Sequence, residues 1–261
     1  MAELCSLEGR TAIVTGGAGH IGSATVRALG ALGAKVMVAD HDGDRASTVA
    51  SEVDGASSWQ ADVTRPDEVD AMVAGAMDLW GRLDIGVNVV GGSGVNGRPV
   101  LETSDEEWQS GIEHNLYSAI RCCRAYAKAM IPGAVAGSIV NVASPAALRA
   151  APGMAPYGAS KAALINFTWT LAVELGPHGI RCNVVVPAFV PHPGMSWGGS
   201  PEEQNALARR VVPMGRVTYA EDVAGAIVAF ASGLMSFCTG QVVVCDGGRM
   251  LTNPMNTGTP G

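Results

Sequence analysis

The stretch "TGGAGHIG", residues 15–22, decides the fold of this 261-residue chain, because it places four glycines in eight positions. A backbone that turns sharply, or that comes close to a bulky group, needs residues without a Cβ atom. An apolar run, "RTAIVT" (10–15), precedes the stretch, and a segment with helical spacing, "IGSATVRALGALG" (21–33), follows it. A glycine-rich turn between a strand and a helix offers unpaired N–H groups, for which a phosphate is the natural ligand.

Strand-like and helix-like segments continue to alternate along the rest of the chain. Short apolar runs predict six further strands, at 34–40, 57–62, 82–88, 137–143, 180–187 and 240–246. Segments with helical spacing lie between most of these runs, and the longest are 104–131 and 156–176. Alternating strands and helices predict a parallel sheet, and continuous apolar strands indicate that both of its faces are buried. We therefore expect an α/β fold, a Rossmann-type doubly wound parallel sheet of about seven strands with helices on both faces.

The composition is that of one globular domain. Hydrophobic residues make up 48% of the chain and charged residues 16%, which predicts a sizeable core. No linker or 20–50-residue repeat divides the sequence, so residues 1–261 are expected to form a single domain. Within it, 188–213 are expected to cover the site as a substrate lid, and 250–261 to form a C-terminal arm.

Charge and cysteine usage exclude several classes of function. The net charge is −7 and no Lys/Arg run occurs, which argues against a nucleic-acid partner. The first residues lack the apolar region of a signal peptide, and the longest apolar runs are too short to span a membrane. The six cysteines show no C-x-x-C pair and no metal-ligand spacing, so we expect reduced thiols in a cytoplasmic protein without a metal site.

Asp40 ends the second strand, 18 residues after Gly22. A dinucleotide-binding fold places an acid at this point, where its carboxylate accepts hydrogen bonds from both ribose hydroxyls. The same carboxylate would repel a 2′-phosphate, so the sequence favours NAD over NADP as the cofactor. The alternative is that Asp40 is a turn residue at the end of a strand.

The chemistry is carried by residues more than a hundred positions later. "YGASK" contains Tyr157 and Lys161, which share one face of a helix because they are four residues apart. Ser144 ends the strand "GSIVNVAS", thirteen residues before Tyr157. Each residue alone has an ordinary explanation, as a surface pair or as a turn residue, but the combination with the glycine turn is rare.

This combination resembles the short-chain dehydrogenase/reductase family, in its compact single-domain branch, over residues 8–249. The resemblance implies a catalytic set of Ser144, Tyr157, Lys161 and Asn115. The residues that it implies for cofactor binding are Gly16, Gly19, His20, Ile21, Asp40, Asp62, Val63, Asn88, Val90, Gly91, Tyr157, Lys161, Pro187 and Val190.

The chain departs from the usual pattern of that family in three places. The third glycine falls one position early, at Gly19, and His20 takes the usual place of a glycine. The segment 88–91 reads "NVVG" where the family usually has N-N-A-G. Ala188 and His192 stand where a glycine and a threonine are usual after Pro187.

The residues suggest a mechanism. Oxidising an alcohol requires a base, and a free tyrosine, with a pKa of ~10, is a poor one. Two cations, Lys161 and an oxidised nicotinamide, are expected to lower the pKa of Tyr157, while Ser144 orients the substrate oxygen. The resemblance implies that Asn115 holds a water that links Lys161 to solvent. The alternative for Asn115 is a buried amide whose hydrogen bonds are satisfied within the protein.

The substrate pocket is expected to be apolar. The side chains that could line it are Leu148, Met154, Phe189, Met195 and Trp197. An apolar or aromatic secondary alcohol and its ketone fit this lining best. Arg149 is the one candidate for binding an anionic group, and the alternative is a solvated loop arginine.

Two other classes of function remain open. The position of Gly19 is also typical of sugar-nucleotide epimerases and dehydratases, and the altered "NVVG" would fit a non-catalytic NAD-binding regulatory protein.

The segment 163–175 is apolar on nearly every side, which indicates that it is buried all round. A second copy of the same helix would cover it, so we expect a homotetramer, with a homodimer as the second choice.

Overall fold

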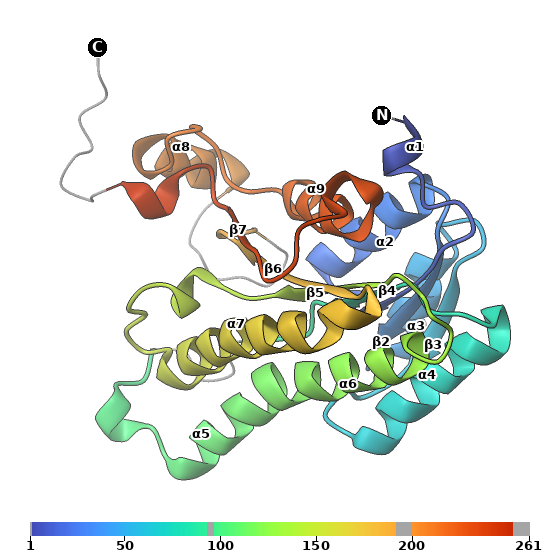
Figure 1. Ribbon diagram of the computed structural model, residues 1–261. Helices are drawn as coiled ribbons and strands as arrows, with labels where there is room; N and C mark the ends of the chain where they lie inside the picture. The colour runs from blue at the N-terminus through green and yellow to red at the C-terminus, as the bar shows by residue number, and fades with distance from the viewer. Residues whose placement is uncertain (1, 93–96, 192–199, 253–261) are drawn as a thin grey trace.

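The computed structural model describes residues 2–92, 97–191 and 200–252, and a seven-stranded sheet lies at their centre (Figure 1). The strands follow the order β3-β2-β1-β4-β5-β6-β7, and every neighbouring pair is parallel. They are β1 (Thr11–Thr15), β2 (Lys35–Asp40), β3 (Ser57–Gln60), β4 (Ile85–Asn88), β5 (Ser138–Val142), β6 (Arg181–Pro187) and β7 (Val242–Cys245). The predicted doubly wound α/β fold is confirmed. Each strand is between one and three residues shorter than predicted, and most of the missing residues precede the point where pairing with the neighbouring strands begins.

Helices cover both faces of the sheet. They are α1 (Ala2–Cys5), α2 (His20–Ala31), α3 (Gly43–Ala50), α4 (Pro66–Trp80), α5 (Asp105–Ile112), α6 (Ser118–Met130), α7 (Ala155–Leu175), α8 (Pro201–Val211) and α9 (Ala220–Ala231). One apolar core joins the sheet to α2, α3 and α9, and a second joins its other face to α4, α6 and α7 (Figure 1). Of the helices in the described ranges, none combines the length and the apolar composition that a bilayer crossing requires.

The segment 104–131 is not the single helix that its spacing predicts. Helix α5 begins at a capping box, in which Ser104 and Glu107 exchange side-chain and backbone hydrogen bonds. A π-helical turn, η2 (Glu113–Tyr117), then separates α5 from α6. In such a turn the backbone hydrogen bonds span five residues and not the four of an α-helix, so one additional residue is accommodated. This π-helical turn contains His114 and Asn115 and places Asn115 against the turn that follows the carboxyl end of β4.

The order of the strands also fixes where a ligand can enter. The chain leaves β1 for α2 on one face, and it leaves the neighbouring strand β4 for α5 and α6 on the other face. The two connections separate at the carboxyl ends of β1 and β4 and leave a crevice there.

Candidate active site

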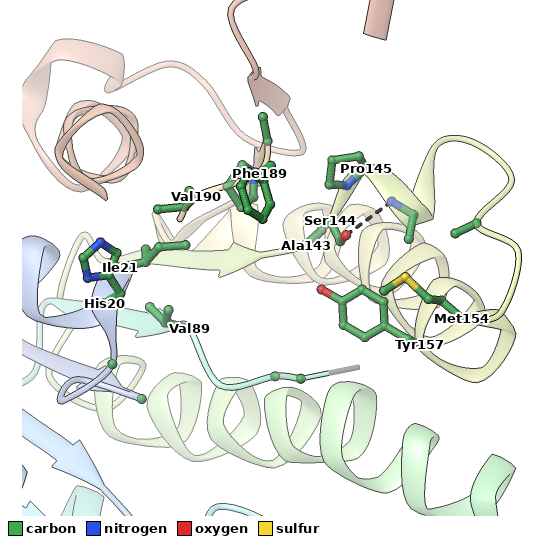
Figure 2. A pocket seen from close by; sticks show the side chains of 18 of the residues that line it. His20, Ile21, Val89, Ala143, Ser144, Pro145, Met154, Tyr157, Phe189 and Val190 are labelled. Carbon is green, nitrogen blue, oxygen red and sulfur yellow. Dashed lines mark hydrogen bonds between the residues drawn. The ribbon is translucent and has the colours of Figure 1, made fainter. Parts of the chain in front are cut away.

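A cavity of about 830 Å³ lies at the carboxyl ends of the strands. Its walls come from the turns after β1, β4, β5 and β6 and from the start of α7. Figure 2 shows Ser144, Met154 and Tyr157 at one end of this cavity and His20 and Ile21 at the other. The volume is in the range of cofactor and small-molecule sites.

The glycine turn forms the first end of the cavity. Gly16 has a φ of +67°, a conformation that residues with a side chain rarely adopt. A Cβ atom on Gly22 would lie 2.0 Å from the Gly16 carbonyl oxygen, so this glycine lets α2 approach the turn. Helix α2 begins at His20, and no side chain caps its N-terminus. The first N–H groups of the helix therefore fit a phosphate group, as the sequence predicts.

Asp40 lies beside this turn and is only 8% exposed. Its carboxylate accepts hydrogen bonds from the backbone N–H of Ala18, at 3.0 Å, and of Asp42, at 3.2 Å. His41 pairs with the same carboxylate through Nδ1 at 2.9 Å, and Arg45 donates to the Ala18 carbonyl oxygen at 2.9 Å. Asp40, His41 and Arg45 all line the cavity, so the predicted acid has basic neighbours there.

Ser144 and Tyr157 form the opposite end of the cavity. Burial raises the pKa of the Tyr157 phenol, and a hydrogen bond with Ser144 opposes this effect. Ser144 also accepts a hydrogen bond from the Ala146 N–H at 3.2 Å, which is drawn in Figure 2. The short turn η3 (Pro145–Ala147) that follows Ser144 therefore fixes its hydroxyl against Tyr157.

Lys161 lies beneath Tyr157 and is almost completely buried. Its Nζ atom is 5.9 Å from the centre of the Tyr157 ring and donates to the Val142 carbonyl oxygen at 3.0 Å. Burial lowers the pKa of Lys161 to about 8. The expectation that Lys161 lowers the pKa of Tyr157 is therefore not met by the protein alone. The desolvation of the phenolate is the larger effect, and it acts in the opposite direction.

Asn115 is a buried amide whose side chain is satisfied within the protein. Its Oδ1 accepts from the Gly92 N–H at 3.0 Å, and its Nδ2 donates to the carbonyl oxygens of Gly92 and Gly111. A Cβ atom on Gly91 would lie 2.7 Å from the Lys161 Nζ and 3.0 Å from the Asn115 Oδ1. Asn115 thus holds the turn after β4 against Lys161, although it does not itself line the cavity.

The structure brings most of the other predicted residues to the same cavity. Those that line it are Gly16, Gly19, His20, Ile21, Asp40, Val90, Gly91, Met154, Pro187, Phe189 and Val190. Met195 and Trp197, two of the predicted substrate residues, and His192 lie outside the described residues.

Besides Asn115 and the buried Lys161, four predicted residues do not line the cavity. Asp62 is exposed and accepts hydrogen bonds from Thr64, and Val63 is buried in the core on the α4 side of the sheet. Asn88 is buried below the cavity, where it bonds to Asn141. Leu148 is 44% exposed on the surface. These positions follow strands, as the sequence indicates, but their side chains point into the core or into solvent.

Besides His41 and Arg45, two basic residues in the cavity wall were not predicted as site residues from the sequence. His114 lies in the π-helical turn η2, where burial and the charge of Lys161 lower its pKa. Arg249 lies in the turn η6 (Arg249–Leu251), directly after the double glycine that follows β7. The available signals were weak: a histidine next to Asn115, and an arginine after "DGG".

Comparisons with known proteins agree with this geometry. The family model described as enoyl-(acyl carrier protein) reductase matches residues 16–250. The 3beta-hydroxysteroid dehydrogenase 1 of Eggerthella lenta is 36% identical, over 94% of this chain and 95% of that protein. A solved short-chain type dehydrogenase/reductase from Mycobacterium marinum is 31% identical, with a TM-score of 0.85 over 96% of this chain and 99% of that one. The chain belongs to the short-chain dehydrogenase/reductase family.

Another relative of this short-chain dehydrogenase/reductase is the 3-oxoacyl-(acyl-carrier-protein) reductase FabG of Chlamydia muridarum. It is 34% identical, over 93% of this chain and 98% of that protein. The general activity is therefore that of an oxidoreductase of this family. Across residues 2–92, 97–191 and 200–252, no group of three or more His, Cys, Asp or Glu side chains could hold a metal ion.

Proposed function

We propose that this protein is an NAD-dependent oxidoreductase that interconverts a secondary alcohol and a ketone by hydride transfer. The observation that carries the proposal is the arrangement of one cavity. Ser144 and Tyr157 lie at one end, with Lys161 beneath them, and the glycine turn with the uncapped start of α2 lies at the other. A dinucleotide bound along this cavity would have its phosphates at the helix and its reactive ring beside Tyr157.

The residues present fit that cofactor. Gly16 and Gly19 leave room for the pyrophosphate at the N-terminus of α2, and the Asp40 carboxylate would meet the adenosine ribose. Lys161 would hold the nicotinamide ribose. The nicotinamide, when bound, accepts hydride from the alcohol or donates it to the ketone. A negative charge at Asp40 opposes a 2′-phosphate, which supports NAD over NADP.

The protein's own contribution to the chemistry is proton transfer and orientation. Burial keeps Tyr157 in its protonated form at neutral pH, so its hydroxyl is ready to donate a proton to the oxygen of a ketone. The Ser144 hydroxyl would bind the same oxygen and hold it against Tyr157. In the direction of oxidation Tyr157 would accept the proton, which requires the positive charge of Lys161 and of the oxidised cofactor to offset its burial.

The relatives support this class of reaction over the alternatives. Those compared above are named as dehydrogenases or reductases, and they match this chain over nearly their whole length. An epimerase or dehydratase of sugar nucleotides has less support, since the cavity lined by Ser144 and Tyr157 has no separate substrate domain beside it in the described residues. The apolar side chains of Met154 and Phe189 favour an apolar or aromatic substrate. The six free thiols suit the cytoplasm.

Equilibrium binding and turnover together test the proposal. Dissociation constants of NADH and NADPH, measured by fluorescence, should show tighter binding of NADH. A panel of aromatic and aliphatic ketones should then oxidise NADH, followed at the nicotinamide absorbance. Equal or tighter binding of NADPH would contradict the choice of NAD. Tight NADH binding without turnover of any ketone or alcohol would instead favour the non-catalytic alternative.

A further inference from the structure

Two arginines line the end of the cavity where the chemistry is proposed. Arg149 follows η3 and the strand β5, and Arg249 follows β7. Asp40 ends β2 and Arg45 follows it, in the other half of the sheet. Because the strand order separates β2 from β5 and β7, Arg149 and Arg249 belong to the substrate end of the cavity and not to the adenosine end.

Acidic residues also lie near the substrate end of the cavity. The acidic residues among the described lining of the cavity are Asp40 and Asp246, and only Asp246 lies near Arg249. The Asp246 carboxylate accepts hydrogen bonds from the N–H groups of Gly248, at 2.8 Å, and Met250, at 2.7 Å, so it is engaged in forming the turn η6. Glu203 lines the second cavity of the structure together with Arg249, and its carboxylate accepts a hydrogen bond from the Ser200 N–H at 2.6 Å. Both carboxylates near Arg249 are therefore engaged by backbone N–H groups.

The two guanidinium groups also influence each other. Burial lowers the pKa of Arg249, the positive charge of Arg149 lowers it further, and Asp246 opposes both effects. Within the described part of the chain, the Arg149 guanidinium makes no hydrogen bond or ion pair and is open to the cavity. Two like charges that face one cavity attract an anion strongly, because the anion relieves their repulsion.

We infer that the substrate carries an oxyanionic group, a carboxylate or a phosphate monoester, which Arg149 and Arg249 bind a few bonds away from the reacting carbonyl. This inference rests on the proposed function and narrows it from apolar ketones in general to oxo acids or phosphorylated ketones. The planar fork of each arginine can donate two parallel hydrogen bonds to such a group. The apolar walls at Met154 and Phe189 then contact the remainder of the substrate.

Phe189 and Arg249 also line a second cavity of about 180 Å³, formed with α8 and residues 217–218. Leu207 and Val211 are among the apolar residues of its other walls, which also contain Glu203. Arg249 thus stands at the boundary between the two cavities. An anion at this boundary would lie with apolar surface on one side and the reacting group on the other, as an aryl or alkyl oxo acid requires.

Matched substrates test the inference directly. The aryl oxo acid 3-benzoylpropionate should be reduced with a kcat/KM at least about tenfold above that of its methyl ester, the effect expected of one charge-assisted hydrogen bond. The phosphate monoester of 4-hydroxybutyrophenone tests the other oxyanion. Preference for either anion over the ester supports the inference, and it shows whether the site binds a carboxylate or a phosphate monoester. Equal kcat/KM for all three would overturn it.

Variants assign the effect to the two arginines. Arg149→Gln and Arg249→Gln should each lower kcat/KM for the preferred anion by about tenfold or more, and leave that for the methyl ester nearly unchanged. Arg209→Gln is the matched control, because Arg209 is an exposed arginine of α8 that lines neither cavity. Arg249→Lys, which keeps the charge, provides a second variant if Arg249→Gln does not fold. An unchanged preference for the anion in both arginine variants would exclude this binding site.

A binding measurement separates this inference from the proposed function. 4-Phenylbutyrate has no reducible carbonyl, and its binding to the cofactor-free protein can be followed by calorimetry, with 4-phenylbutanol as the neutral control. Carboxylate binding that is lost in both arginine variants supports the inference, even if no ketone is reduced. Turnover of neutral ketones without any such carboxylate binding would overturn the inference and leave the proposed function intact.

Discussion

At the level of single residues, Tyr157 and Lys161 are buried next to each other, and burial shifts their pKa values in opposite directions. Burial opposes charge on either side chain, so it raises the pKa of the phenol and lowers that of the ammonium. Lys161 is nevertheless held by the Val142 carbonyl oxygen, an acceptor that favours a donating N–H group. Burial of this pair therefore favours the protonated form of Tyr157, and a bound substrate and cofactor would change this environment.

Replacing Tyr157 by Phe tests the proton-transfer role. The change removes one hydroxyl and its hydrogen bond with Ser144, so the free energy of unfolding should fall by only about 1 kcal/mol. NADH binding should be retained, while ketone reduction should fall by at least about a hundredfold, the lower end for loss of a general acid. Fluorescence titration and steady-state kinetics measure the two effects. Turnover close to that of the wild type would show that another group donates the proton.

Replacing Lys161 by Met tests the electrostatic cost of its burial. The pKa of Lys161 in the folded protein, about 8, lies below the usual value of 10.5, so between these values the folded state binds fewer protons than the unfolded chain. Stability contributed by this site therefore rises with pH in that window and is lowest below pH 8. Between pH 7 and pH 10 the wild type should gain up to about 3 kcal/mol relative to Lys161→Met.

Urea denaturation of both proteins at several pH values measures this difference, in which the titration of other groups cancels. The same variant should bind NADH more weakly and reduce ketones more slowly, because the proposed ribose contact is lost. Parallel pH profiles for the two proteins would mean that Lys161 is not ionised differently in the folded and unfolded states.

At the scale of elements, the packing of α2 against the turn after β1 depends on missing side chains. A Cβ atom on Gly22 would lie 2.0 Å from the Gly16 carbonyl oxygen and 2.8 Å from the Gly17 Cα, and both of these are backbone atoms that cannot rotate away. The helix would have to move away from the turn, and its N–H groups would move with it. Stability and cofactor binding are thus coupled at one position.

Gly22→Ala should therefore destabilise the protein by about 2 kcal/mol or more and weaken NADH binding. Gly225→Ala is the matched control, because Gly225 lies inside α9 and a Cβ atom there would meet nothing within 4 Å. That control should be neutral, or more stable by about 0.5–1 kcal/mol, since alanine is the better helix former. Thermal melts and NADH titrations of both variants measure these effects. Equal stability of the two variants would contradict the close approach of α2 to the turn.

The π-helical turn is the second element that matters for the site. It places Asn115 so that the amide bonds to Gly92 on one side and Gly111 on the other, which ties α5 to the turn after β4. A regular helix over the same residues would rotate Asn115 relative to that turn. The irregular turn and the buried amide therefore form one unit that supports Lys161.

At the scale of the whole molecule, helix α7 presents apolar side chains to two sides. Leu171 is buried and Phe167 packs against the core, but Trp169 is 47% exposed and Val173 is 78% exposed. Phe237, between α9 and β7, is also fully exposed. Apolar groups gathered on one helix face mark an interaction surface, and we propose a second copy of the chain as the partner.

A homotetramer is the expected assembly, with a homodimer as the second choice. Light scattering at micromolar concentration measures the mass in solution. The double variant Trp169→Glu, Val173→Glu should lower that mass, because four charged groups cannot be desolvated in a two-fold interface. Leu101→Glu is the control, since Leu101 is 99% exposed in the turn η1 (Val100–Glu102), away from α7. A wild-type protein that is monomeric and active would exclude the proposed interface.

Features that depend on a few neighbouring residues could be predicted from the sequence of this protein. Continuous apolar runs predict buried parallel strands, and the glycines of residues 15–22 predict a close turn, because each depends on a few neighbouring residues. Ser144, Tyr157 and Lys161 were found in the same way, since a strand end and a helix face with a spacing of four residues are both local features. The predicted fold is confirmed. Ser144 and Tyr157 line one cavity, and Lys161 lies buried beneath Tyr157.

Tertiary structure alone decided which side chains at the strand ends face that cavity. Asn88 ends a strand next to the site, yet its side chain bonds to Asn141 below it, because the two strands lie side by side. Arg149 and Arg249 are a hundred residues apart in sequence and share one cavity only because the sheet order brings the turns after β5 and β7 together. Local patterns fix which element a residue belongs to, but the direction of its side chain and its partners depend on contacts between elements distant in the chain. For that reason the oxidoreductase family could be predicted from the sequence, and Arg149 could be named as a candidate for binding an anionic group, whereas its position beside Arg249 in one cavity could not.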